Sequence, residues 1–485
     1  MSALRRVRPL LRRVLFHGAG GVEWLCGLLL GWRGLRQYLG RRMTLQGLSR
    51  LEAAHVRLVD DLLLRPLLRA YYRRQAAEIR WPTQGADTQP SQVVFVLNIF
   101  HLFKQPVSSH LKLIGDIISL YADAGYKVSM LLLNHPYTSQ PRNANLAVQD
   151  MFHSSRQLIE DRVRADLLSM NGRSFDDCSI RVLLNAEQTW PLTKAVDAVA
   201  SALADFDLGP ADHLFAAAGV VGSDLGNEVL AQAPGPKKHC LVFSAEFIVP
   251  KAMIRPFDTI IQPLGERNAT VDHQGTIREA CYSVSPLHWA LDRQGELHPA
   301  EEQLLEALRA HGPDVLYVAV KQDVVGVLTE SFAQALKGGC PPSGRAAVVL
   351  IGTNGKQPSA LTRGGHWQPA DVFTLDYSPH LSQLFHALQA IAPAVLCMPP
   401  CSGGGFGMQL STFAGMPLVA YRGSDGEIYY PPACFADSRE AYSARLYQLS
   451  TDAAFRQSEA EAQLQHFDGI NARWQQFYLD LVGRA

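Results

Sequence analysis

A run of three glycines is the most chemically informative feature of the sequence: Gly403, Gly404 and Gly405. The run follows an apolar stretch that ends at Pro399-Pro400, and a helix is predicted directly after it, from about Phe406 to Ala414. Glycines lack a Cβ atom, so the backbone N–H groups of such a turn can approach a ligand closely. The positive end of the helix dipole points at the same place, which suits a diphosphate. A tight strand-to-helix turn would need glycines as well, so both interpretations remain open.

Two lysines and two acidic residues could complete a phosphate site around this turn. Lys321 follows the predicted strand "LYVAV", and Lys356 lies in "GTNGKQ" after the strand "AVVLI", so both ammonium groups come at the carboxyl ends of strands. Their charge would stabilise a leaving nucleoside diphosphate, and each could instead be an ordinary solvated lysine. Asp425 and Glu427, in "RGSDGEIYY", could bind ribose hydroxyls or the sugar, or serve as turn residues.

Candidate acid–base residues lie in the N-terminal half. His110 stands at the expected start of a helix, where an imidazole could accept a proton from an attacking hydroxyl group or contact a phosphate. Asp224 in "GVVGSDLGN" and Glu246 in "FSAEF" follow other predicted strands and are candidate carboxylate bases. A single histidine or carboxylate in such a place is often purely structural.

The elements that must position these residues alternate between strands and helices. The apolar run Val93–Phe100 predicts a buried strand, and Ser108 or Ser109 caps a predicted helix that runs to about Ala124. Gly125 ends that helix, and "KVSMLLLN" is the next predicted strand. The resulting β-α-β unit is the building block of a doubly wound parallel sheet, and a second series of such units follows residue 300.

The sequence therefore predicts an α/β protein with two Rossmann-like domains and an N-terminal helical extension. The expected boundaries are 1–88 for the Arg-rich extension, 89–300 for an acceptor domain and 301–460 for a donor domain. Residues 461–485 are expected to form a C-terminal helix that packs back on the N-terminal domain. A length of 485 residues is too great for a single hydrophobic core and fits this division.

Charge and cysteine content exclude several classes of protein. The chain has 45 basic and 45 acidic residues, whereas a nucleic-acid binder would normally carry a basic excess. The eight cysteines show neither a disulfide framework nor zinc-site spacing, so no metal site is expected and a reducing cytoplasm fits best.

The first 50 residues differ from the rest of the chain in their charge. They contain ten arginines against one acidic residue, and their apolar runs are too short to cross a bilayer. Such a segment can lie on an anionic membrane surface, which would place the protein on the cytoplasmic face of the membrane. The alternative is an extension that packs on the catalytic domains or on a second subunit, and the sequence leaves open whether the chain forms a homo-oligomer.

The C-terminal pattern resembles the bacterial glycosyltransferases of the GT-B fold. The matching pieces are Pro399-Pro400, the glycine turn, "FAGMPLVA" (Phe413–Ala420) and "GSDGE" (Gly423–Glu427), and a looser similarity extends over residues 93–480. The resemblance implies transfer of a sugar from a nucleoside-diphosphate sugar to a polysaccharide, lipid-linked or protein acceptor. It also implies that the reaction needs no metal ion and no cofactor.

One departure from that family concerns its glutamates. Many retaining members carry two glutamates, with seven residues between them, around this loop, and one of them holds the donor ribose. Here the corresponding positions hold Gly404 and Thr412 in one alignment, and Leu410 takes the second position in another. Whether the sugar configuration is retained or inverted therefore does not follow from the sequence.

Two other functions remain as alternatives. A non-catalytic GT-B-like scaffold or partner subunit would explain the missing glutamates. An NAD(P)-dependent oxidoreductase could also use a glycine-rich turn, although it should carry Gly-x-Gly-x-x-Gly in its first β-α-β unit. The corresponding segment here, "NIFHLFKQPVSSH", has no glycine.

Overall fold

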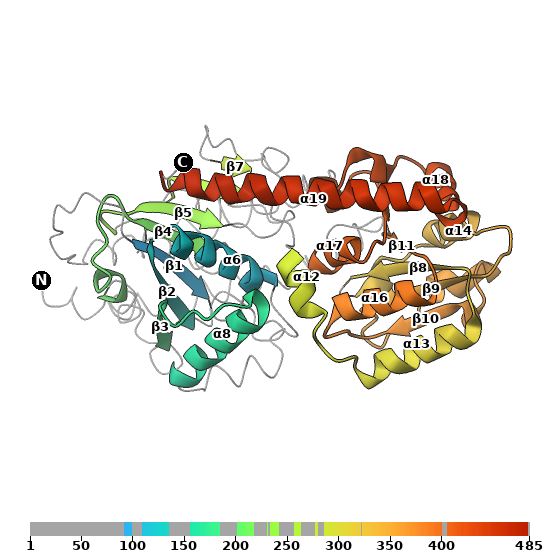
Figure 1. The fold of residues 1–485 in the computed structure, drawn as a ribbon, viewed down its shortest axis with the longest axis horizontal. Coiled ribbons are helices and arrows are strands. Elements are labelled where there is room, and N and C mark those ends of the chain that lie inside the picture. Colours follow the sequence, from blue (N-terminus) through green and yellow to red (C-terminus); the bar gives the residue numbers. More distant parts are fainter. Residues whose placement is uncertain are drawn as a thin grey trace, which may run out of the picture. The chain divides into compact units, whose positions relative to one another are not determined.

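The computed structural model describes two α/β regions and the helices that connect and cover them (Figure 1). The described residues are 92–98, 109–134, 156–184, 201–217, 230, 233–241, 257–262, 277–279, 286–321, 323–399 and 405–483. The predicted extension over residues 1–88 lies outside them. The chain divides into two compact units, one containing the strands of the first sheet and the other containing helices α6 and α8 and the residues from Glu279 onward.

The first sheet has seven strands in the order β3-β2-β1-β4-β5-β6-β7. Neighbouring strands from β3 to β6 pair in parallel, and the first six strands follow the Rossmann order. The strands are β1 (Gln92–Asn98), β2 (Lys127–Asn134), β3 (Ser179–Leu184), β4 (His213–Ala217), β5 (Lys237–Leu241), β6 (Thr259–Gln262) and β7 (Ile277–Glu279).

Residues Val93–Leu97 of β1 are all buried, as predicted for a central parallel strand with both faces covered. In the chain, α6 (Ser109–Asp123) follows β1 and α8 (Arg156–Asn171) follows β2. Gly125 adopts φ 84°, a left-handed conformation that ends α6 and leads into β2. The predicted first β-α-β unit is confirmed.

The second sheet has six strands in the order β10-β9-β8-β11-β12-β13, and every pair in it is parallel. The same Rossmann order therefore appears twice in the chain. The strands are β8 (Val315–Val320), β9 (Ala346–Ile351), β10 (Val372–Leu375), β11 (Ala394–Cys397), β12 (Leu418–Tyr421) and β13 (Phe435–Ala436).

Helices on both sides cover this second sheet. One pair is α13 (Pro299–His311) with α16 (Leu381–Ile391), and another is α14 (Glu330–Gly338) with α18 (Arg439–Thr451). The remaining helices from residue 286 onward are α12 (Pro286–Asp292), α15 (Ser359–Thr362), α17 (Gly405–Phe413) and α19 (Ala453–Leu481). The predicted helix near Phe406–Ala414 is confirmed within about one residue.

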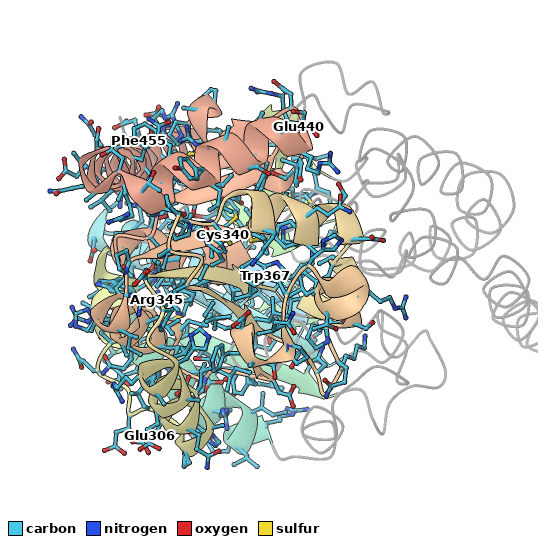
Figure 2. The ribbon with its side chains drawn as sticks, turned by 90° about the vertical axis from the view of Figure 1, so that its right-hand side faces the viewer. Glu306, Cys340, Arg345, Trp367, Glu440 and Phe455 are labelled. Carbon is cyan, nitrogen blue, oxygen red and sulfur yellow. The ribbon has the colours of Figure 1, made fainter. Side chains whose placement is uncertain are left out.

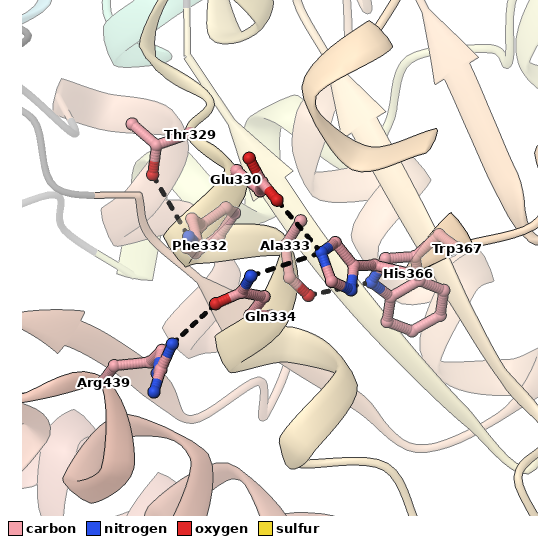
Figure 3. A network of polar contacts seen from close by, with 8 residues as sticks. All are labelled: Thr329, Glu330, Phe332, Ala333, Gln334, His366, Trp367 and Arg439. Carbon is pink, nitrogen blue, oxygen red and sulfur yellow. Dashed lines mark hydrogen bonds and ion pairs between the residues drawn. The ribbon is translucent and has the colours of Figure 1, made fainter. Parts of the chain in front are cut away.

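A buried aromatic cluster joins β8 to the helices α14 and α18. Trp367, labelled in Figure 2, packs edge-on against Tyr317. Its indole N–H donates to the carbonyl of Ala333 at 3.1 Å (Figure 3). At the rim of this cluster, Arg439 donates to Gln334, whose amide nitrogen lies 3.3 Å from His366 (Figure 3). The loop before β10 is thereby bonded to α14, and Arg439 links α14 to α18.

Helix α19 closes the described chain and packs on α17, α18 and α6. The Tyr121 hydroxyl of α6 donates to the carbonyl of Tyr478, and the two rings meet edge-on. The expected boundary at residues 460/461 falls inside this 29-residue helix. No helix among the described residues is long and apolar enough to cross a membrane.

Two buried histidines stack on each other at the amino-terminal side of the first sheet. His213 Nδ1 lies 2.9 Å from His239 Nε2, and both residues are nearly inaccessible to solvent. Burial, reinforced by the charge of Lys237, lowers the pKa of His213 from its usual 6.5 to about 4. Burial and the neighbouring His213 lower the pKa of His239 to about 3. Both rings are therefore neutral in the folded protein above about pH 4.

The free energy of unfolding is predicted to rise with pH between about pH 3 and pH 6.5. In that window the unfolded chain binds protons that the two folded rings exclude, so stability is complete above pH 6.5 and is lost as the pH falls. Each ring contributes up to about 1.4 kcal/mol per pH unit. Urea unfolding across this range measures the slope. The double variant His213→Phe/His239→Phe should flatten it, whereas His386→Gln, at an exposed position, should leave it unchanged.

Candidate functional site

The carboxyl ends of the second sheet's strands gather along one edge, because all of its strands are parallel. The strand order reverses between β8 and β11: the chain leaves β8 toward β9 and leaves β11 toward β12. Loops diverge at such a switch point and open a crevice, which is where open α/β sheets bind ligands. Lys321 directly follows β8, and α17 follows β11, so both belong to this point.

The first turn of α17 lies against the end of β8. A Cβ atom on Gly407 would come within 3.1 Å of both Val320 Cγ2 and Leu381 Cδ1. A glycine at this position therefore allows the helix to approach the strand closely. Val320 immediately precedes Lys321, so the first turn of α17 lies close to the backbone of this lysine. The first turn of α17 carries no acidic side chain, and the N–H groups at the start of a helix, which have no partner within the helix, are suited to an anion.

Buried hydrogen bonds fix the rest of α17. Tyr430 donates to the carbonyl of Met408 at 2.7 Å and lies 3.0 Å from the Thr412 hydroxyl group. Ser411 donates to the same carbonyl at 2.7 Å. Burial raises the pKa of Tyr430 well above its usual value, so its phenol stays protonated. These buried hydrogen bonds fix the position of the helix that carries the candidate anion site.

Lys356 lies at the end of β9, in the place predicted for it, and its ammonium group forms an ion pair. Lys356 Nζ is 2.7 Å from both carboxylate oxygens of Asp323, in the loop after β8. The turn before Lys356 is held by Asp376, which directly follows β10 and accepts hydrogen bonds from the Thr353 hydroxyl and the Gly355 N–H. These two hydrogen bonds hold the pKa of Asp376 below its usual value.

The segment after β12 forms a compact turn. Gly423 has φ 87°, and its N–H donates to Glu427 Oε1 at 2.9 Å. Arg422 pairs with Asp437 at 2.6 Å, which joins the ends of β12 and β13. Glu427 therefore contributes to this turn. Asp425 begins the 3-10 helix η8 (Asp425–Ile428), and its side chain lies outside the described part.

The structure places one group of the predicted site residues at the same edge of the second sheet. It does not describe the side chains of the other group. Lys321, Lys356, Gly405 and the turn at 423–427 all follow strands of the second sheet at the same edge. The residues Gly403, Gly404, Asp224 and Glu246 lie outside the described residues, and His110 is described only as part of the α6 backbone.

Three residues at this edge escaped the sequence reasoning: Asp323, Asp376 and Arg422. The latter two directly follow the ends of β10 and β12, and Asp323 is the third residue after β8. Position after a strand was the usable signal, since the same criterion identified Lys321. Their pairing could not be read from the sequence, because each ionic or hydrogen-bonded partner follows a different strand.

The described part of the chain shows no group of side chains suited to metal binding, and three of its cysteines are unsuited to thiol chemistry. No group of three or more His, Cys, Asp or Glu residues there could hold a metal ion. The thiols of Cys178, Cys240 and Cys434 are buried, and burial raises the pKa of each to about 12. These thiols are therefore protonated and belong to the core.

No protein-family model matches the sequence, and no curated protein matches it significantly. Solved structures do match. The trehalose-6-phosphate synthase OtsA has a TM-score of 0.52 and 13% identity, covering 81% of this chain and 99% of that chain. A trehalose-6-phosphate structure from E. coli bound with UDP-2-fluoro glucose has a TM-score of 0.51 and the same identity and coverages. A Thermobaculum terrenum O-GlcNAc transferase mutant has a TM-score of 0.49 and 14% identity, covering 90% of this chain and 75% of that chain.

The first two likenesses show the fold. Both extend over nearly the whole of the matched chains, and they agree with the two parallel sheets of Rossmann order described above. The expectation of a GT-B fold with two Rossmann-like domains is confirmed.

The close packing of α17 on β8 predicts a specific sensitivity at Gly407. Gly407→Val should lower the free energy of unfolding by about 1–3 kcal/mol, because its methyl groups would collide with Val320 and Leu381. The matched control is Gly469→Val in α19, where a Cβ atom would meet nothing within 4 Å. Thermal or urea unfolding of the two variants measures the difference. Equal stability of both variants would contradict the close approach.

Proposed function

We propose that the chain is a GT-B glycosyltransferase that binds a nucleoside-diphosphate sugar at the carboxyl edge of its second sheet. The observation that carries this proposal is the position of the N-terminus of α17 at the β8/β11 switch point. There Gly407 packs against Val320, the residue before Lys321. The fold shared with a protein solved with UDP-2-fluoro glucose supports it.

The proposed chemistry is stabilisation of a leaving nucleoside diphosphate. Negative charge accumulates on the diphosphate as the bond to the sugar breaks. Backbone N–H groups at the start of α17, in the turn with Gly403, Gly404 and Gly405, would share that charge with Lys321 and Lys356. Two ammonium groups at the strand ends could perform the task for which other transferases use a metal ion, so we propose a metal-independent reaction without a cofactor.

The acceptor would be activated by residues of the N-terminal half. His110, Asp224 and Glu246 remain the proposed proton acceptors for the attacking hydroxyl group. A polysaccharide, a lipid-linked sugar or a protein could supply that hydroxyl. The Arg-rich first 50 residues favour an acceptor at the cytoplasmic face of a membrane, because arginines are attracted to anionic lipid headgroups.

A nucleotide-binding protein without transferase activity is the second candidate. Thr412, one of the positions where related enzymes carry a glutamate, is 2% exposed, and its hydroxyl contacts Tyr430. It therefore cannot take the place of a ribose-binding carboxylate. An active enzyme must hold the ribose with other groups, whereas a partner subunit would need no such contact.

A panel of sugar nucleotides tests the proposal. The wild-type protein should bind UDP or GDP and hydrolyse or transfer at least one of their sugars. Replacing Lys321 with Met should weaken binding of the matching nucleotide roughly tenfold or more, because a charge-assisted hydrogen bond to phosphate is lost. Isothermal titration measures the affinity, and release of nucleoside diphosphate measures the reaction.

The outcomes separate the two candidates. Nucleotide binding without turnover on any donor would favour the non-catalytic partner. Binding of NAD(H) but of neither UDP nor GDP would contradict both and restore the oxidoreductase alternative.

A further inference from the structure

The ion pair between Asp323 and Lys356 links the loops that follow two adjacent strands. Asp323 follows β8 and Lys356 follows β9. Lys356 Nζ lies 2.7 Å from each carboxylate oxygen of Asp323. Two backbone hydrogen bonds tie the same loops: Lys321 N–H donates to the Ile351 carbonyl, and Val324 N–H donates to the Gly352 carbonyl. The pair therefore belongs to a well-connected part of the strand edge.

Asp323 directs its carboxylate at Lys356 and not at the helix that follows it. It has φ 60° and ψ 50°, a left-handed conformation that few non-glycine residues adopt, and it precedes the 3-10 helix η5 (Val324–Val327). Aspartate in this place usually accepts a hydrogen bond from the helix N-terminus, but the Asp323 side chain makes none. A Cβ atom on Gly326 would stand 2.9 Å from Asp323 Oδ2, so this glycine leaves the carboxylate its space.

Lys356 is fixed through its main chain as well. Asn354 and Gly355 have φ 52° and φ 71°, and Lys356 N–H donates to the Thr353 carbonyl, which closes a tight turn. Asp376 grips this turn through Gly355 N–H at 2.7 Å. One carboxylate thus holds the turn that precedes the lysine, and another holds its ammonium group.

Stability gives little reason for this arrangement. The side chains of Asp323 and Lys356 are 33% and 52% exposed, and ion pairs of such exposure contribute at most about 1 kcal/mol. Left-handed non-glycine residues instead cluster where a structure positions a functional group. An ammonium group has three N–H donors, and Asp323 engages two of them at most, which leaves one for a phosphate oxygen.

We propose that Asp323 is a positioning residue, which holds the Lys356 ammonium group at the ends of β8 and β9 so that its remaining N–H can meet the donor diphosphate. The inference rests on the proposed function and adds to it a carboxylate that acts only through Lys356. Asp323 itself does not touch the phosphate, because two anions would repel each other.

The test is a double-mutant cycle on nucleotide binding, with UDP and GDP as probes at low ionic strength. Asp323→Asn should weaken binding about threefold to tenfold, and Lys356→Met should weaken it at least as much. In the Lys356→Met background the Asp323→Asn substitution should have no further effect, since the group that it orients is gone.

A matched control comes from the amino-terminal ends of the same two strands. Asp314 and Arg345 directly precede β8 and β9 and form an ion pair of similar exposure. Asp314→Asn removes a comparable pair and should leave UDP and GDP affinity unchanged. A loss of affinity in Asp314→Asn equal to that in Asp323→Asn would assign the effect to stability and overturn the proposal.

The remaining outcomes are distinguishable. Unchanged or tighter binding by Asp323→Asn, in a wild-type protein that binds UDP or GDP, would overturn the positioning role and leave the proposed function standing. An undiminished effect of Asp323→Asn in the Lys356→Met background would also overturn it. Failure of the wild-type protein to bind either nucleotide would contradict the proposed function and this inference together.

Discussion

The contact between α17 and the end of β8 is the constraint on which the candidate site depends. Because Gly407 presents no side chain, the helix starts against Val320 at the one point of the sheet where the chain leaves neighbouring strands in opposite directions. Buried hydrogen bonds from Tyr430 and Ser411 to the Met408 carbonyl hold the helix in that position. A dipole end that is fixed in this way can favour an anion without rearranging, which is the condition for electrostatic catalysis.

Basic groups along the same edge are paired with carboxylates. Lys356 is balanced by Asp323, and Arg422 is balanced by Asp437. Each pair joins the ends of adjacent strands, so the pairs connect loops that no secondary structure connects. Their partial exposure limits what they add to stability and leaves the basic groups accessible to a more highly charged partner such as a diphosphate.

The shared fold constrains the function only loosely. Rossmann-like pairs of domains support many reactions, so the case for sugar transfer depends on the groups at the strand ends and not on the similarity of 13% identical chains. Neither alignment supplies the glutamates that many retaining GT-B glycosyltransferases carry at this loop, and Glu427 contributes to a turn. Ribose recognition is therefore the part of the proposed mechanism in which this chain must differ most from the enzymes that it resembles.

The sequence by itself determined the fold class and the local elements. The apolar, β-branched run Val93–Leu97 predicted a central strand, and Gly125, with φ 84°, ended the predicted helix before the next strand, since glycine tolerates left-handed φ at no steric cost. Tertiary structure alone decided that Lys356 meets Asp323, 33 residues away, and that Glu427 is engaged by Gly423. Strand order sets which loops become neighbours, and the linear pattern does not say which side chains of those loops will meet.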